Sequence, residues 1–124
     1  MKDRKVIVDT SSIIFGLSKR HDVFSKLSEE YPGYSILLSK GILNEINGIA
    51  SGKGRYSKSA KTALELIKRN KNIEINSSTM YPDDWILDNA HKGAIICTND
   101  AALKANIKKK GAVVFSVTIN GTLR

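Results

Sequence analysis

Four acidic residues lie at or near the ends of segments that the sequence predicts as strands. Asp9 directly follows the apolar, β-branched run at residues 6–8, which is typical of a buried strand. An ionised carboxylate beside such a run is costly unless it is paired or coordinated. The other three acids are Glu45, Asp84 and Asp100. If the strands are parallel, their carboxyl ends share one edge of the sheet, and the four carboxylates can converge there.

Converging carboxylates imply a particular chemistry. They repel one another and raise one another's pKa values, and a divalent cation between them removes that cost. Ligands that are all oxygen favour Mg²⁺ or Mn²⁺ over zinc. Such a centre suits phosphoryl transfer, because the metal activates a water and neutralises charge on a departing phosphodiester oxygen.

The charge of the chain agrees with a polyanionic partner. Twenty Lys and Arg residues stand against twelve Asp and Glu residues, a net charge of +8. Nucleic acid is the usual partner of such a surface, although a solvated basic face is the ordinary alternative. The candidate RNA-binding residues are Lys53, Arg55, Tyr56 and Lys58, in which the tyrosine could stack on a base.

Strands and helices are expected to alternate. Apolar runs predict strands at 5–9, 34–38, 72–76, 94–97 and 112–115, with helical spacing of apolar residues between them. This order favours an α/β fold, a three-layer α/β/α sandwich around a central, mainly parallel sheet. The length of 124 residues predicts one domain over 1–124, with a mobile tail near Asn120.

Two observations bear on reactivity and location. Cys97, the one cysteine, sits in the apolar run 94–97 and is expected to be a buried hydrophobe, not a thiol nucleophile. The longest apolar runs span about four residues, far short of the roughly 20 that cross a bilayer. With no signal peptide in view either, we expect a cytoplasmic protein without a membrane partner.

Four short motifs resemble those of the PIN-domain ribonucleases, in the same order and over nearly the whole chain. They are Val8-Asp9-Thr10-Ser11, Leu43-Asn44-Glu45-Ile46, Asp83-Asp84-Trp85-Ile86-Leu87 and Thr98-Asn99-Asp100-Ala101-Ala102-Leu103. The resemblance implies the PIN-like fold and Mg²⁺- or Mn²⁺-dependent cleavage of single-stranded RNA by a metal-activated water. It assigns the metal, and with it catalysis, to Asp9, Glu45, Asp84 and Asp100. Polar residues next to the first and last acids would support them: Ser11 or Thr10, and Thr98 or Asn99.

The adjacent acids Asp83 and Asp84 leave a choice open. We expect Asp84 to be the ligand, because apolar residues follow it at the usual offsets, and Asp83 to cap the helix. Asp88, one turn after Asp84, is either a further site residue or part of a solvated helix face. Asp9 and Asp100 could likewise serve only as helix caps.

The main rival function is a catalytically inactive PIN-like module that binds RNA or protein, for instance in ribosome assembly. Within the enzyme hypothesis, the resemblance allows a toxin with an antitoxin partner or an rRNA-processing nuclease. Some members of the family are homodimers, but no feature of this sequence decides the oligomeric state. The sequence also does not decide between one metal ion and two, or which RNA is cut.

Overall fold

The structure, a computed structural model, describes residues 4–124 and alternates strands with helices as the sequence predicts. The strands in this part of the chain are β1 (Lys5–Val8), β2 (Ser35–Ser39), β3 (Ile73–Asn76), β4 (Ile95–Cys97) and β5 (Val113–Phe115). The helices are α1 (Thr10–Ser18), α2 (Val23–Glu30), α3 (Lys40–Ser51), α4 (Ser57–Arg69), α5 (Pro82–Asp88) and α6 (Ala101–Lys109). Among these residues no helix is long and apolar enough to cross a membrane.

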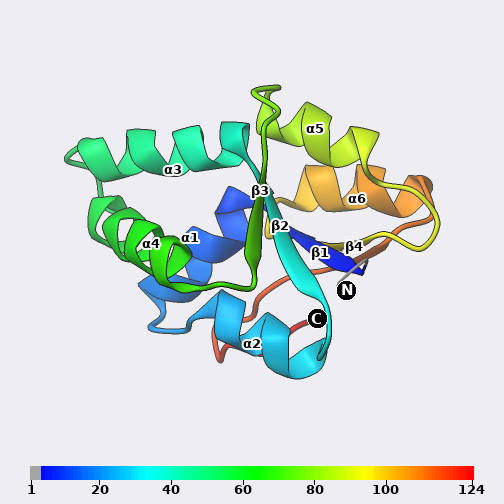
Figure 1. Ribbon diagram of the computed structural model, residues 1–124, viewed down its shortest axis with the longest axis horizontal. Coiled ribbons are helices and arrows are strands. Elements are labelled where there is room, and N and C mark those ends of the chain that lie inside the picture. Colours follow the sequence, from blue (N-terminus) through cyan, green and yellow to red (C-terminus); the bar gives the residue numbers. More distant parts are fainter. Residues whose placement is uncertain (1–3) are drawn as a thin grey trace.

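The five strands form one sheet in the order β3-β2-β1-β4-β5, and every neighbouring pair is parallel. The predicted α/β fold with a parallel sheet is therefore confirmed. β1 lies in the centre, and its residues Val6, Ile7 and Val8 are buried, as expected of a strand covered on both faces. In Figure 1, α5 and α6 lie together on one side of the sheet and α2 lies on the other.

Side-chain caps fix where two of the helices begin. The Asp22 carboxylate accepts from the backbone N–H groups of Phe24 and Ser25 at the start of α2, and Ser39 Oγ accepts from Ile42 N–H at the start of α3. Each cap satisfies backbone donors that the first turn of a helix otherwise leaves unpaired. Because Ser39 also ends β2, its cap starts α3 at the carboxyl edge of the sheet.

Cys97 is part of the core, as predicted. Its side chain is fully buried on β4, and burial raises the pKa of its thiol to about 12. The thiolate that would act as a nucleophile is therefore not formed near neutral pH.

The last residues of the chain form a turn beside β5, and their mobility stays a prediction. Val117 and Leu123 pair in an antiparallel bridge, and the turn between them is closed by Thr118 and Thr122. Val117 is 3% exposed, so this segment covers part of the core next to β5. Apolar residues flank the Asn-Gly turn, a pattern typical of a hairpin.

Gly41 gives the first prediction. A Cβ atom at Gly41 would collide with the carbonyl oxygen of Met80, where the chain passes the start of α3 on its way to α5. We expect Gly41→Ala to lower the free energy of unfolding by about 1–3 kcal/mol, measured by urea denaturation.

Gly48→Ala is the matched control on the same helix. Nothing lies within 4 Å of a Cβ built there, so alanine should stabilise α3 by about 0.5–1 kcal/mol. Equal effects of the two substitutions would contradict the close contact between α3 and the segment before α5.

Candidate functional site

Asp9 ends the central strand and is only 4% exposed. It stands at the N-cap position of α1, yet its side chain caps no backbone N–H, so the interpretation of Asp9 as a mere helix cap is wrong. Its Oδ2 atom instead accepts hydrogen bonds from Ser11 Oγ at 2.7 Å and from Thr98 Oγ1 at 2.8 Å. Because both bonds fall on one oxygen, Oδ1 has no hydrogen-bond partner within residues 4–124 and is available to a ligand.

Two hydroxyls join the turn after β1 to the turn after β4. Ser11 Oγ and Thr98 Oγ1 lie 3.3 Å apart, and each also accepts from a backbone N–H: Asn99 N–H donates to Ser11 at 3.0 Å and Asp100 N–H to Thr98 at 3.1 Å. The network is possible because β1 and β4 are parallel neighbours in register, with Val8 opposite Cys97. Asp9 and the turn that carries Asp100 are thereby held side by side.

Asn99 contributes through its backbone and not through its amide. Its side-chain Oδ1 accepts from Ser12 Oγ at 2.7 Å and from Val117 N–H at 2.9 Å, and its Nδ2 donates to the Val117 carbonyl at 2.9 Å. These bonds tie α1 to the segment after β5. The amide group is therefore occupied by the scaffold and does not reach Asp9.

More carboxylates lie near Asp9. The pKa of Asp83 is raised first by partial burial and then by the negative charges of Asp9, Asp100, Glu45 and Asp84. The ion pairs in residues 4–124 lie elsewhere, so no Lys or Arg there neutralises these acids. The carboxylates come from β1, α3, α5 and the turn before α6, and they form a region of uncompensated negative charge.

The donor set of this region, which we call the acidic cluster (Asp9, Glu45, Asp83 and Asp100), fits a hard divalent cation. All four donors are carboxylates, as Mg²⁺ and Mn²⁺ prefer. In the described part of the chain, no three acidic, His or Cys side chains stand as close as the ligands of a closed metal site. Carboxylates that repel one another stay apart unless a cation lies between them.

Asp100 has two uses that do not exclude each other. Its Oδ1 accepts from Leu103 N–H at 2.9 Å and so caps α6, as its sequence position allowed. The residue is exposed, and only one of its two carboxylate oxygens makes this bond. The cap fixes the side chain at the edge of the sheet and leaves the other oxygen for a ligand.

The structure shows how Asp83 and Asp84 are placed at the start of α5. The expectation that Asp83 caps its helix is wrong: the N-cap residue of α5 is Tyr81, and Pro82 takes the first helical position. Asp83 is half-buried, whereas Asp84 and Asp88 are exposed, and Asp84 is itself among the charges that raise the pKa of Asp83. Neighbouring helical residues point about 100° apart. Asp83 is thus the more buried of the pair, and the sequence-based choice of Asp84 as the ligand stays a prediction.

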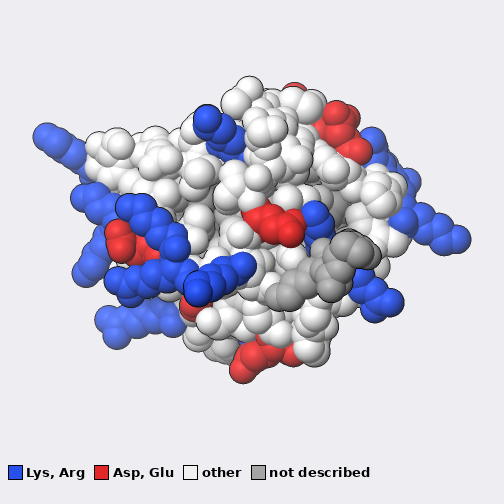
Figure 2. Space-filling view, in the orientation of Figure 1, with Lys and Arg blue, Asp and Glu red and all other residues white. Residues whose placement is uncertain are grey.

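The predicted RNA-binding residues form an exposed basic rim at the loop between α3 and α4. Lys53, Arg55, Tyr56 and Lys58 are all exposed, and the Arg55 guanidinium lies 5.2 Å from the centre of the Tyr56 ring. Figure 2 shows Lys and Arg side chains gathered over the neighbouring helix α4, at the left of the view. Part of the charge that attracts a polyanion thus lies over α4, and further Lys and Arg side chains stand at the right of the same view.

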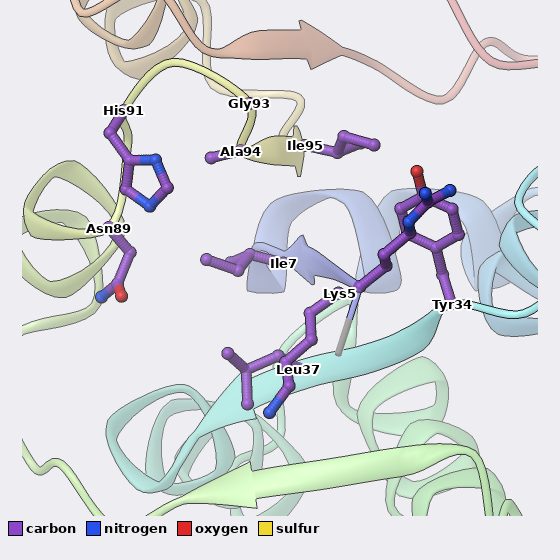
Figure 3. A pocket seen from close by; sticks show the side chains of 10 residues that line it. Lys5, Ile7, Tyr34, Leu37, Asn89, His91, Gly93, Ala94 and Ile95 are labelled. Atoms are coloured by element: carbon purple, nitrogen blue, oxygen red, sulfur yellow. The ribbon is translucent and has the colours of Figure 1, made fainter. Parts of the chain in front are cut away.

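A pocket of about 390 Å³ lies away from this site (Figure 3). Its walls come from the amino ends of the strands and from the segment before β4, including Lys5, Ile7, Leu37 and His91. None of the acids of the cluster lines it. It opens at the opposite end of the parallel strands from Asp9.

Comparisons with known proteins agree with this architecture. The family model described as PIN like domain matches residues 6–119. The solved structure of the PIN domain endonuclease Utp24 aligns with a TM-score of 0.73 and 28% identity, covering 97% of this chain and 89% of that chain. A domain of a functionally unknown protein from Methanocaldococcus jannaschii aligns with a TM-score of 0.65 and 16% identity, covering 93% and 91%. No curated protein sequence matches the chain.

The hydroxyl network predicts a cost for Thr98→Val. Valine has nearly the shape of threonine but removes the hydrogen bonds to the Asp9 carboxylate and from Asp100 N–H. We expect the free energy of unfolding to fall by about 1–3 kcal/mol. Thr62→Val, on the exposed face of α4, should change it by less than about 0.5 kcal/mol. Similar losses in both variants would show that the network does not hold the site.

The raised pKa of Asp83 predicts a pH-dependent effect of Asp83→Asn in the presence of a chelator. The folded state binds the Asp83 proton more tightly than the unfolded chain does, so stability falls as pH rises through this range. The amide should therefore stabilise the protein at pH 7, by less than about 1 kcal/mol because solvent screens the site. The gain should vanish below the unfolded-state pKa, and thermal unfolding at pH 7 and pH 3 measures it. A loss of stability at pH 7 would contradict the repulsion.

Proposed function

The chain belongs to the PIN-like domain family, and from that premise we propose that it is a Mg²⁺- or Mn²⁺-dependent endoribonuclease that cleaves single-stranded RNA. The family and the likeness to the endonuclease Utp24 support a nuclease-type function. The observation that carries the proposal is the acidic cluster at the carboxyl edge of the sheet, which no basic side chain of residues 4–124 neutralises.

We assign the metal-binding role to Asp9, Glu45, Asp83 and Asp100. A divalent cation at these carboxylates would lower the pKa of a water and offset the charge of the phosphodiester. Asp9 supplies its Oδ1, because Ser11 and Thr98 hold Oδ2. Asp100 supplies the oxygen that does not cap α6. Glu45 is exposed on the second turn of α3 and is free to move toward the others.

The chain's own residues would also hold the RNA. The basic rim around Lys53, Arg55 and Lys58 offers positive charge to the phosphates, and its exposure lets a flexible strand reach it. Ser11 and Thr98 are positioning residues, since they fix the Asp9 carboxylate without a role of their own in bond cleavage. A biological role as a toxin or in rRNA processing would rest on the same chemistry.

The proposal predicts which acids matter for RNA cleavage. With Mn²⁺ and an unstructured RNA, Asp9→Asn and Asp83→Asn should lower the cleavage rate by about two orders of magnitude or more, because several kcal/mol of charge stabilisation are lost. Asp84→Asn is the matched control on the adjacent exposed position and should stay within a few-fold of wild type. A chelator should abolish cleavage by the wild type.

Other cleavage results would contradict or revise the proposal. Equal cleavage by the wild type and Asp9→Asn would point to a contaminant and overturn the proposal. A loss in Asp84→Asn as large as in Asp83→Asn would return the ligand to Asp84. If the wild type does not cleave but binds RNA with strong salt dependence, the rival function as an inactive RNA-binding module is correct.

A further inference from the structure

A second, mostly apolar pocket lies next to the acidic cluster. It has a volume of about 350 Å³ and is lined by Thr10, Ser11, Ile14, Phe15, Ile49, Tyr56 and Asn99. Its walls come from the first turns of α1, the end of α3, the residue before α4 and the turn after β4. The volume is at the lower end of the range for small-molecule pockets, about 300–1,000 Å³, so it suits a single flat ring system and not a base pair.

One polar atom next to this pocket has no partner. Thr10 is 5% exposed, and its Oγ1 is the buried side-chain oxygen or nitrogen of the described residues that makes no hydrogen bond. A buried hydroxyl without a partner costs free energy and calls for an explanation. The oxygen has almost no accessible surface, so it lies behind the pocket wall and does not face a ligand in the pocket.

The mouth of the pocket carries an aromatic platform. Tyr56 is 40% exposed, so its ring can be reached from solvent, and the Arg55 guanidinium lies 5.2 Å from the ring centre. Phe15 lines the opposite part of the pocket, with Lys19 Nζ 5.9 Å from its ring centre. Aromatic rings backed by cations attract flat π-systems that are linked to phosphates.

The pocket also shares residues with the acidic cluster. Ser11 lines the pocket and donates to the Asp9 carboxylate, and Asn99 lines it while its backbone N–H donates to Ser11. A nucleotide whose phosphate lies at the cluster would therefore have its base beside this pocket. The apolar walls, the aromatic platform and the adjacent phosphate site all match the chemistry of one nucleobase.

We propose that this pocket binds one unpaired nucleobase of the RNA, next to the phosphodiester that is cleaved. This inference rests on the proposed function, because it takes RNA as the ligand of the cluster. Tyr56 stacks on the base, and the apolar walls that include Ile14 and Ile49 enclose it. The pocket thereby restricts the enzyme to single strands at the cleavage site.

Binding of short RNAs tests the proposal without relying on cleavage. The probes are unstructured RNAs of about ten nucleotides in Ca²⁺ buffer, followed by fluorescence anisotropy, with one base at a time replaced by an abasic nucleotide. One position should weaken binding when its base is removed. Tyr56→Ala should weaken binding of the intact RNA by roughly 5- to 100-fold, and Tyr56→Phe, the matched control that keeps the ring, by less than about 3-fold.

The decisive comparison combines the Tyr56→Ala substitution with the abasic RNA. Tyr56→Ala should cause no further loss with the RNA that lacks the recognised base, whereas Lys53→Ala should weaken both RNAs alike and lower the salt dependence. Because Tyr56 is exposed, its variants are expected to fold, and circular dichroism checks this.

The experiments distinguish failure of the nucleobase-pocket proposal from failure of the endoribonuclease proposal. If the wild type cleaves RNA but Tyr56→Ala binds every probe as the wild type does, the nucleobase pocket is overturned and the nuclease function stands. Equal losses in Tyr56→Ala and Tyr56→Phe would also overturn it. If the base-dependent binding is found but no cleavage is, the pocket stands and the catalytic proposal fails.

Discussion

Repulsion among carboxylates at one edge of the parallel sheet costs folding free energy that the rest of this structure must offset. Folding brings Asp9, Glu45, Asp83 and Asp100 within electrostatic reach of one another, and burial together with these charges raises the pKa of Asp83. Such a grouping opposes folding, since like charges destabilise the compact state. In the proposed function a divalent cation would offset this repulsion, and the rest of the fold supplies the stability that the like charges take away.

The centre of the sheet supplies that stability. β1 is covered on both faces, and it ends at a carboxylate whose Oδ2 is fixed by two hydroxyls, one from each neighbouring turn. The same hydroxyls accept the N–H groups of Asn99 and Asp100, so position and stability come from one network. Ser11 then extends this network into the apolar pocket under Tyr56. The acidic cluster, the pocket and the basic rim thus form one continuous surface.

Much of the fold could be predicted from local patterns, because apolar runs and caps such as Asp22 and Ser39 are properties of neighbouring residues. The acids at the strand ends could be predicted for the same reason. The contact between Ser11 and Thr98 could not be predicted, because it depends on the register of two strands far apart in sequence. The N-cap position of α5 was missed because Pro82 takes the first helical position, and the bridge between Val117 and Leu123 depended on contacts that form only in the fold.

The central claim is that these carboxylates form one metal-binding centre. Isothermal titration calorimetry of Mn²⁺ at pH 7 tests it directly, with the wild type, Asp9→Asn and Asp84→Asn measured in the same buffer. Binding by the wild type and by Asp84→Asn, with binding lost in Asp9→Asn, is the predicted result. Binding of equal strength in all three proteins, or in none of them, would contradict the assignment of the acidic cluster as the metal site.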